Sequence, residues 1–168
     1  GMAVNDDSIA VIIAAFNAEQ TIGNAISSAL ACPQVSEVVV VDDASRDGTV
    51  RAANCFDERV KVLEQPENRG PACARNWAIR ESRAPLIAIL DADDHFLPNR
   101  FERMLSGSEW DLLADNLIVY EDAETIAPFM RRLSLVEGWY IDLRFEDFVR
   151  GNIPRRGMRR GEMGFLKP

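Results

Sequence analysis

The sequence is poor in the residues that several common catalytic and metal sites require. It has a single histidine, His95, and three widely spaced cysteines, Cys32, Cys55 and Cys73. A Ser-His-Asp or Cys-His catalytic set cannot be built around one histidine in that position. The cysteines form neither a CxxC pair nor a zinc-binding pattern, so we expect them to be buried and reduced, as in a cytosolic protein.

The sequence also lacks the segments that mark a membrane protein or a familiar nucleotide-binding loop. Its longest apolar run, from Ile9 to Phe16, is strand-sized, whereas roughly 20 apolar residues are needed to cross a bilayer. No basic region followed by an apolar region opens the chain, so we expect no signal peptide and a cytoplasmic location. The patterns GxGxxG and GxxxxGK[ST] are absent, which argues against the usual dinucleotide fold and against a P-loop.

Positive charge is scarce overall but concentrated near the end of the sequence. The 19 basic and 27 acidic residues give a formal net charge of −8, which argues against a nucleic-acid partner. Residues 150–168 nevertheless contain six basic residues against one glutamate. Two interpretations of Arg155–Arg160 stay open. One is a loop that contacts a lipid pyrophosphate or the anionic inner face of the membrane, and the other is a solvated surface loop.

Apolar runs alternate with helical patterns over the first hundred residues. The run Ile9–Ala15 is continuous and rich in β-branched residues, which is typical of a buried parallel strand. Asn17, with Gln20 three residues later, resembles a capping box and predicts a helix start. The alternation, with a period of about 20 to 25 residues, predicts an α/β fold with a mostly parallel sheet and helices on both faces. Further strands are expected over Glu37–Val41, Val60–Leu63, Leu86–Leu90 and Leu112–Tyr120, and helices from Thr49, Pro71 and Pro98.

Polar residues follow each of the first four predicted strands. In parallel sheets the carboxyl ends of the strands share one edge, and ligands bind there. The convergence therefore predicts a ligand site at that edge of the sheet. The residues that contribute to it are Asn17, Asp42, Asp43, Asn68, Arg69, Asp91, Asp93 and Asp94.

Three carboxylates lie within four residues, at Asp91, Asp93 and Asp94, and like charges this close repel one another. In extended backbone Asp91 and Asp93 point to the same side, so their oxygens could bind Mg²⁺ or Mn²⁺ together with substrate phosphate. The alternative is that Asp93 or Asp94 caps a following helix, which explains one carboxylate and not three. His95, next to them, is interpreted as a local hydrogen-bonding residue.

Two other polar positions have alternatives of their own. Asp42 and Asp43 either contact a ligand or form a turn in which Ser45 and Asp47 are local caps. Arg75 lies on the first turns of the helix that Pro71 opens. It either binds an anionic or planar nucleotide group or is a solvated surface residue.

Four stretches together resemble a known family. They are VIIAAFNAEQTIGNAISSAL, VVVVDDASRDGT, NRGPACARNWAI and LDADDHFLPNRF, in this order. Over about residues 9–105 they resemble the N-terminal half of family 2 glycosyltransferases, which have the Rossmann-like GT-A fold. The nearest likeness is to bacterial exopolysaccharide enzymes of the succinoglycan type. The resemblance implies transfer of a sugar from a nucleotide-sugar donor, usually a UDP-sugar, to a polysaccharide or lipid-linked saccharide acceptor, with Mn²⁺ or Mg²⁺ as cofactor.

The resemblance also implies roles for individual residues. Ala14, Ala15 and Phe16 would line the base pocket, Asp43 would hydrogen-bond the uracil ring, and Asp42 would lie beside it. Arg75 would lie near the base or the phosphate. In the DxD motif Asp91-Ala92-Asp93, Asp93 would contact ribose or metal, and Asp94 could share the metal. Asn17 and Asn68 complete the nucleotide-sugar-binding set.

The second part of the sequence departs from the family pattern. Members that invert the anomeric carbon need a carboxylate base, and the pair Glu146-Asp147 comes too early to match it. We therefore expect the base beyond Pro168. Residues 1–106 are predicted to form the nucleotide-sugar-binding half, and residues 107–168 the start of an acceptor-side half. The alternatives are a binding module without turnover and a nucleotidyltransferase. A nucleotidyltransferase typically carries a glycine-rich loop with a basic residue after the first strand, and this sequence lacks both there.

Overall fold

The structure is a computed structural model, and it describes residues 7–105 of the chain. These residues belong to the first of two units into which the chain divides, Gly1–Gly107; the second, Ser108–Pro168, lies outside the described residues. The expected strand Leu112–Tyr120, the pair Glu146-Asp147 and the basic stretch Arg155–Arg160 also lie outside them. These expectations, and the boundary at residue 106, therefore stay predictions.

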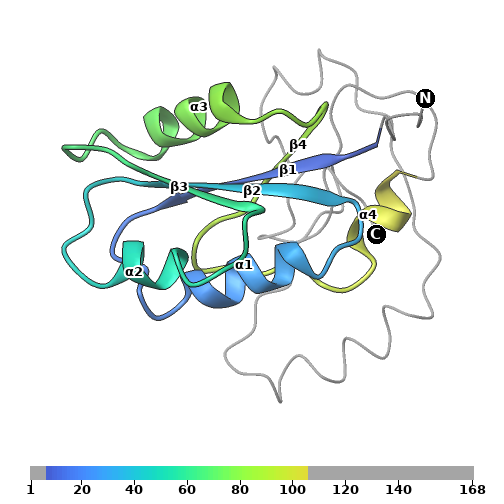
Figure 1. The fold of residues 1–168 in the computed structure, drawn as a ribbon, viewed down its shortest axis with the longest axis horizontal. Coiled ribbons are helices and arrows are strands. Elements are labelled where there is room, and N and C mark those ends of the chain that lie inside the picture. Colours follow the sequence, from blue (N-terminus) through green and yellow to red (C-terminus); the bar gives the residue numbers. More distant parts are fainter. Residues whose placement is uncertain (1–6, 106–168) are drawn as a thin grey trace, which may run out of the picture. The chain divides into compact units, whose positions relative to one another are not determined.

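A four-stranded parallel sheet forms the centre of the described residues. Its strands are β1 (Ile9–Ala15), β2 (Val35–Asp42), β3 (Val60–Glu64) and β4 (Leu86–Ile89), in the order β3-β2-β1-β4 (Figure 1). Each neighbouring pair is parallel, with Ala15 of β1 beside Asp42 of β2 at the carboxyl end. The four predicted strands are thus confirmed, with small differences in their ends.

Helices cover both faces of this sheet. They are α1 (Ile22–Leu30), α2 (Thr49–Ala53), α3 (Pro71–Glu81) and α4 (Arg100–Met104), with α3 on one face and α1 and α2 on the other (Figure 1). Alternate residues of β1 explain the two layers, because successive side chains of a strand point to opposite faces. Val11 and Ile13 join the apolar cluster around α1, whereas Ala10 and Ile12 join the cluster that contains Ala74 and Ala78 of α3. The predicted fold is confirmed.

The predicted capping box at Asn17 is wrong. Helix α1 begins at Ile22, after a Thr21 that makes no side-chain cap hydrogen bond. Asn17 has a left-handed backbone with φ of 50°, and its Oδ1 accepts a hydrogen bond of 2.9 Å from the backbone N–H of Arg46. The side chain thus serves a neighbouring loop instead of its own helix. Helix α4 likewise begins later than Pro98, at Arg100, following Asn99 with φ of 63°.

The three cysteines are free, but only one is buried. Cys32 is buried, Cys73 is half-buried and Cys55 is exposed, so the expectation of burial is wrong for Cys55. Burial raises the pKa of the Cys32 thiol, an effect that the charge of Arg100 partly opposes. Within residues 7–105, no helix combines the length and the apolar character that crossing a membrane requires.

Candidate donor-binding site

The predicted polar residues meet at the carboxyl edge of the sheet. Because the strands are parallel, the segments that follow them all leave from this edge. The edge therefore gathers residues 16–21 after β1, 43–48 after β2, 65–70 after β3 and 90–99 after β4. The prediction that these residues lie at one edge of the sheet is therefore correct. The hydrogen bonds and the exposure of the individual residues differ from one to the next.

Asp43 is buried, and both oxygens of its carboxylate accept hydrogen bonds from its own chain. Its Oδ1 accepts hydrogen bonds from Gln65 Nε2 at 2.6 Å and from the backbone N–H of Arg69 at 2.7 Å. Its Oδ2 accepts one from Gly70 N–H at 2.8 Å, and its backbone oxygen accepts one from Asn68 Nδ2 at 3.2 Å. Asp43 and Asn68 therefore hold the loop between β3 and α3 in place.

Asp42 is equally buried but retains an unused acceptor. Its Oδ2 accepts a hydrogen bond of 2.9 Å from the backbone N–H of Ser45, whereas its Oδ1 has no hydrogen-bond partner within residues 7–105. A buried carboxylate oxygen without a donor is costly, so it needs an explanation. Asp42 ends strand β2, and of the predicted local caps Asp47 accepts the N–H of Thr49; a ligand N–H would satisfy the remaining oxygen of Asp42.

The end of β1 lies directly beside Asp42. Ala15 is buried, Ala14 is half-buried, and Phe16 exposes 50% of its surface. An exposed aromatic ring at a ligand-binding edge is a surface on which a planar base can stack. Of the residues expected to line a base pocket, Ala15 thus pairs in register with Asp42, and Ala14 and Phe16 are its chain neighbours.

The chain turns immediately after β4, and this corrects two expectations. The backbone N–H of Asp94 donates to the backbone oxygen of Asp91 at 3.0 Å, so Asp91 and Asp93 do not sit in extended backbone on one side. Helix α4 begins only at Arg100, so neither Asp93 nor Asp94 caps a helix. Ala92, between the two aspartates of the DxD sequence, is buried, and both aspartates are exposed.

Arg75 of α3 reaches across to this turn. Its Nη2 lies 2.7 Å from Asp91 Oδ1 in an ion pair, while its buried Nε has no hydrogen-bond partner among the described residues. Arg75 is therefore a partly exposed residue in an ion pair, and both interpretations of it stay open. The pair is partly exposed, with 35% of the Arg75 side chain and 54% of the Asp91 side chain accessible.

The aspartates after β4 suit a hard divalent cation by charge and ligand type. Desolvation raises the pKa of Asp94, and the charges of Asp93 and then Asp91 raise it further, whereas His95 lowers it. Carboxylate oxygens are the ligands that Mg²⁺ and Mn²⁺ prefer, usually with phosphate and water completing the shell. Within residues 7–105, no three His, Cys, Asp or Glu side chains are gathered closely enough to hold a metal by themselves.

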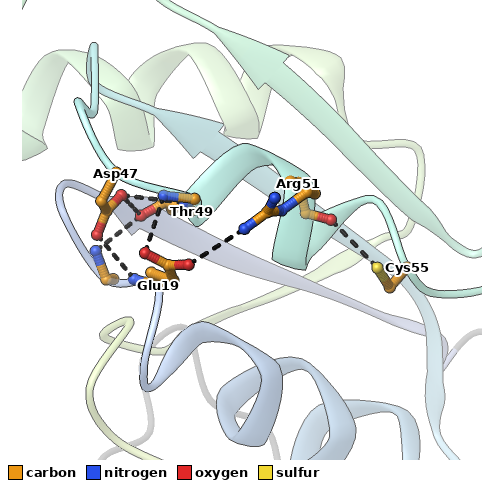
Figure 2. Close-up of polar contacts among 7 residues, drawn as sticks. Glu19, Asp47, Thr49, Arg51 and Cys55 are labelled. Carbon is orange, nitrogen blue, oxygen red and sulfur yellow. Dashed lines mark hydrogen bonds and ion pairs between the residues drawn. The ribbon is translucent and has the colours of Figure 1, made fainter.

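Sequence reasoning missed a group of residues that joins two of the loops. Ser45, Asp47 and Thr49 were interpreted at most as local caps. Asp47 does accept the backbone N–H of Thr49 at 3.0 Å, but its other oxygen accepts the backbone N–H of Glu19, 28 positions away (Figure 2). The spacing of Ser45, Asp47 and Thr49 is visible in the sequence, but their partners in a distant loop are not.

Comparisons with known proteins identify the family. The model described as Glycosyl transferase family 2 matches residues 10–159. The succinoglycan biosynthesis protein ExoU of Rhizobium meliloti (strain 1021) is 45% identical, and the match covers 95% of this chain and 47% of that protein. The Escherichia coli UDP-Glc:alpha-D-GlcNAc-diphosphoundecaprenol beta-1,3-glucosyltransferase WfgD is 35% identical over 61% of this chain and 42% of its own length. The chain thus spans about half the length of the curated relatives it matches.

Solved structures agree with this result. S. aureus TarS in complex with UDP-GlcNAc is 25% identical with a TM-score of 0.55, over 59% of this chain and 30% of that one. The mannosyltransferase PcManGT from Pyrobaculum calidifontis, in complex with GDP-Man and Mn²⁺, is 30% identical with a TM-score of 0.50, over 57% and 30%. The family predicted from the four sequence stretches is confirmed, and the chain belongs to glycosyl transferase family 2.

Proposed function

We propose that this chain carries the donor half of a metal-dependent glycosyltransferase that takes a nucleotide-sugar, a UDP-sugar, and acts in polysaccharide assembly. The observation that carries the proposal is the carboxyl edge of the sheet. There Asp42, whose buried Oδ1 is unpaired within the described residues, pairs in register with Ala15 at the end of β1, and the exposed Phe16 follows Ala15 in the chain. An acceptor oxygen and an aromatic surface at one edge of a sheet suit a base that presents an N–H, as the imide of uracil does.

The contacts of Asp43 support a choice between the two aspartates for the base contact. Both oxygens of Asp43 already accept hydrogen bonds from Gln65, Arg69 and Gly70, whereas Asp42 keeps a free oxygen. We therefore assign the base contact to Asp42. Asp43 positions the loop that leads to α3, and Asn68 of that loop contributes a further hydrogen bond to Asp43.

The diphosphate and its cation would lie toward α3 and the turn after β4. Arg75 supplies a partly exposed guanidinium, and Asp91, Asp93 and Asp94 supply carboxylate oxygens. A bound Mg²⁺ or Mn²⁺ neutralises the charge that develops on the departing diphosphate. The complex of PcManGT with GDP-Man and Mn²⁺ supports the class of cofactor.

The acceptor and the location are part of the same proposal, and the names of two relatives support the acceptor. WfgD is named for a diphosphoundecaprenol-linked substrate, and ExoU for succinoglycan biosynthesis. We propose a growing, lipid-linked polysaccharide as acceptor, met in the cytoplasm or at the inner face of the membrane. Contact with an anionic surface through Arg155–Arg160 would fit this location, and vesicles with and without anionic lipid test it.

A thermal-shift titration with UDP, GDP, dTDP and NAD, each with and without Mn²⁺, tests the donor assignment. A ligand at about 100 times its dissociation constant stabilises the native state by about 2.7 kcal/mol, which is readily measured. We expect UDP with Mn²⁺ to give the largest shift and Asp93→Ala to remove the metal-dependent part. No shift with any nucleotide would contradict the proposal.

The alternative is a module that binds the nucleotide-sugar without turning it over. We expect the catalytic base beyond Pro168, and the shared length with relatives, 47% of ExoU, motivates this alternative. Assays of UDP-sugar binding and sugar transfer on the same preparation separate the two cases. Binding without transfer favours the module.

A further inference from the structure

Two loops at the carboxyl edge are joined by hydrogen bonds between side chains and backbone. The first loop, residues 16–21, leads from β1 to α1, and the second, residues 43–48, leads from β2 to α2. Three successive backbone N–H groups of the first loop each donate to a different side chain in or next to the second. These bonds are Asn17 to Ser45 Oγ at 2.8 Å, Ala18 to Thr49 Oγ1 at 2.8 Å and Glu19 to Asp47 Oδ2 at 3.1 Å.

Two backbone N–H groups of the second loop in turn donate to side chains of the first loop. The backbone N–H of Arg46 donates to Asn17 Oδ1 at 2.9 Å, and that of Gly48 donates to Glu19 Oε2 at 3.1 Å. The other oxygen of Glu19 lies 3.4 Å from Arg51 Nη2 (Figure 2). A Cβ on Gly48 would lie 2.5 Å from Glu19 Oε1, so a larger residue there would displace the end of the Glu19 side chain. We call these reciprocal contacts of residues 17–19 with residues 45–49 the loop clasp.

Thr49 is the centre of the loop clasp. Its side chain is fully buried, and its hydroxyl accepts from Ala18 N–H while it donates to Asp47 Oδ1. The hydroxyl therefore orients Asp47, whose second oxygen holds Glu19 N–H. These bonds, the Thr49 hydroxyl first, keep the pKa of Asp47 below its usual value, so the acceptor stays ionised at neutral pH.

The loop clasp holds backbone conformations that are unfavourable by themselves. Asn17 has φ of 50° and Ala44 has φ of 62°, and a left-handed conformation at a non-glycine residue persists only where the surroundings over-determine it. These residues flank the candidate base-binding groups, because Asn17 follows Phe16 and Ala44 lies two residues after Asp42. The contacts that fix the two loops therefore act on the chain directly after Phe16 and directly after Asp42.

We propose that Glu19, Asp47 and Thr49 are positioning residues that fix the loop after β1 relative to the loop after β2, so that the nucleoside end of the donor site is formed before any ligand or metal binds. This inference rests on the proposed function, and it adds residues that contact neither the nucleotide nor the cation. A site formed in advance avoids the cost of ordering loops during binding. If the competent arrangement is only partly populated, the apparent affinity falls by that fraction.

The test measures the affinity of the 168-residue chain for UMP in the presence of EDTA. It compares the wild-type chain with the variants Thr49→Val and Thr49→Ser. Valine matches the shape of threonine but removes the hydroxyl, whereas serine keeps it. We expect UMP affinity to fall about tenfold, or about 1.4 kcal/mol, in Thr49→Val and to stay within about twofold in Thr49→Ser. We also expect faster hydrogen exchange at the amides of residues 17–19 in Thr49→Val.

Ser82→Ala is the control for loss of a side-chain hydrogen bond away from the loop clasp, because Ser82 Oγ donates only locally, to Ile79 O at 2.7 Å. Unfolding curves establish the folded fraction of each variant. If Thr49→Val does not fold, Glu19→Ala replaces it, because the Glu19 side chain is partly exposed. We expect Glu19→Ala to lower UMP affinity by about threefold.

The outcomes separate the two proposals. Folded Thr49→Val that binds UMP as tightly as the wild-type chain overturns the positioning role and leaves the donor site standing. An equal loss in Thr49→Val and Ser82→Ala also overturns it, because the effect would then be one of general stability. A wild-type chain that binds neither UMP nor UDP overturns the proposed function, and the positioning role with it.

Discussion

Two neighbouring aspartates with the same burial have different tasks in this structure. Asp42 and Asp43 are each 3% exposed, but Asp43 accepts hydrogen bonds on both oxygens and Asp42 on one. The sequence shows two identical residues side by side, and the resemblance placed the base contact on Asp43. The distinction arises from the loop after β3, whose donors reach one carboxylate only, and this is a tertiary effect that no local pattern encodes.

Substituting each of these aspartates by asparagine separates their tasks. In Asp43→Asn an NH₂ group must face at least one N–H of Gln65, Arg69 or Gly70, so we expect the free energy of unfolding to fall by about 1–3 kcal/mol. In Asp42→Asn the amide oxygen can still accept from Ser45 while the NH₂ group takes the unpartnered side. Asp42→Asn should therefore change stability by less than about 1 kcal/mol and weaken UMP binding.

Urea unfolding and UMP titration on both variants make the comparison. Equal destabilisation by the two substitutions would contradict the division of tasks. If Asp42→Asn binds UMP with the affinity of the wild-type chain, Asp42 does not contact the base.

At the scale of elements, the start of α3 depends on one backbone conformation. Gly70 precedes α3 with φ of 86° and ψ of 161°, a region that is essentially restricted to glycine, and its N–H donates to Asp43. A Cβ at this position would meet no atom within 4 Å, so the cost of alanine is a backbone cost alone. We expect Gly70→Ala to lower the free energy of unfolding by about 1–3 kcal/mol in urea titrations.

Gly23 in α1 provides the matched control. A Cβ there also meets nothing within 4 Å, and the backbone is helical. Gly23→Ala should therefore stabilise the chain by up to about 1 kcal/mol, since alanine loses less conformational entropy in a helix. A neutral Gly70→Ala, with Gly23→Ala behaving as expected, would show that the loop adapts to a different φ.

The elements differ in how well the sequence predicts them. The parallel strands were predictable because buried β-branched runs such as Ile9–Ala15 leave few alternatives. The start of α1 was not, because a capping pattern at Asn17 does not reveal whether its side chain serves its own helix or a loop 29 positions away. The turn after β4 was missed for a similar reason, since its Asp91 is held by Arg75 of α3.

At the scale of the whole molecule, the site could be located from the sequence but not resolved in detail. Parallel topology sends every carboxyl strand end to one edge, so the polar residues after four strands had to converge. Which of them face a ligand and which hold the edge together depends on contacts between loops far apart in the chain. The loop clasp and the pair of Arg75 with Asp91 are both of this kind.

The charge of the whole molecule leads to a last prediction, about ionic strength. The formal net charge of −8 repels an anionic nucleotide, and several carboxylates lie near the candidate site. Raising the ionic strength from about 0.01 to about 0.1 M shortens the screening length from about 30 to about 10 Å. In EDTA we expect this change to raise the association rate of UDP by about twofold or more and to leave neutral uridine unaffected. Stopped-flow measurements on both ligands test this, and a UDP rate that falls with salt would mean that Arg75 and its neighbouring cations outweigh the net charge.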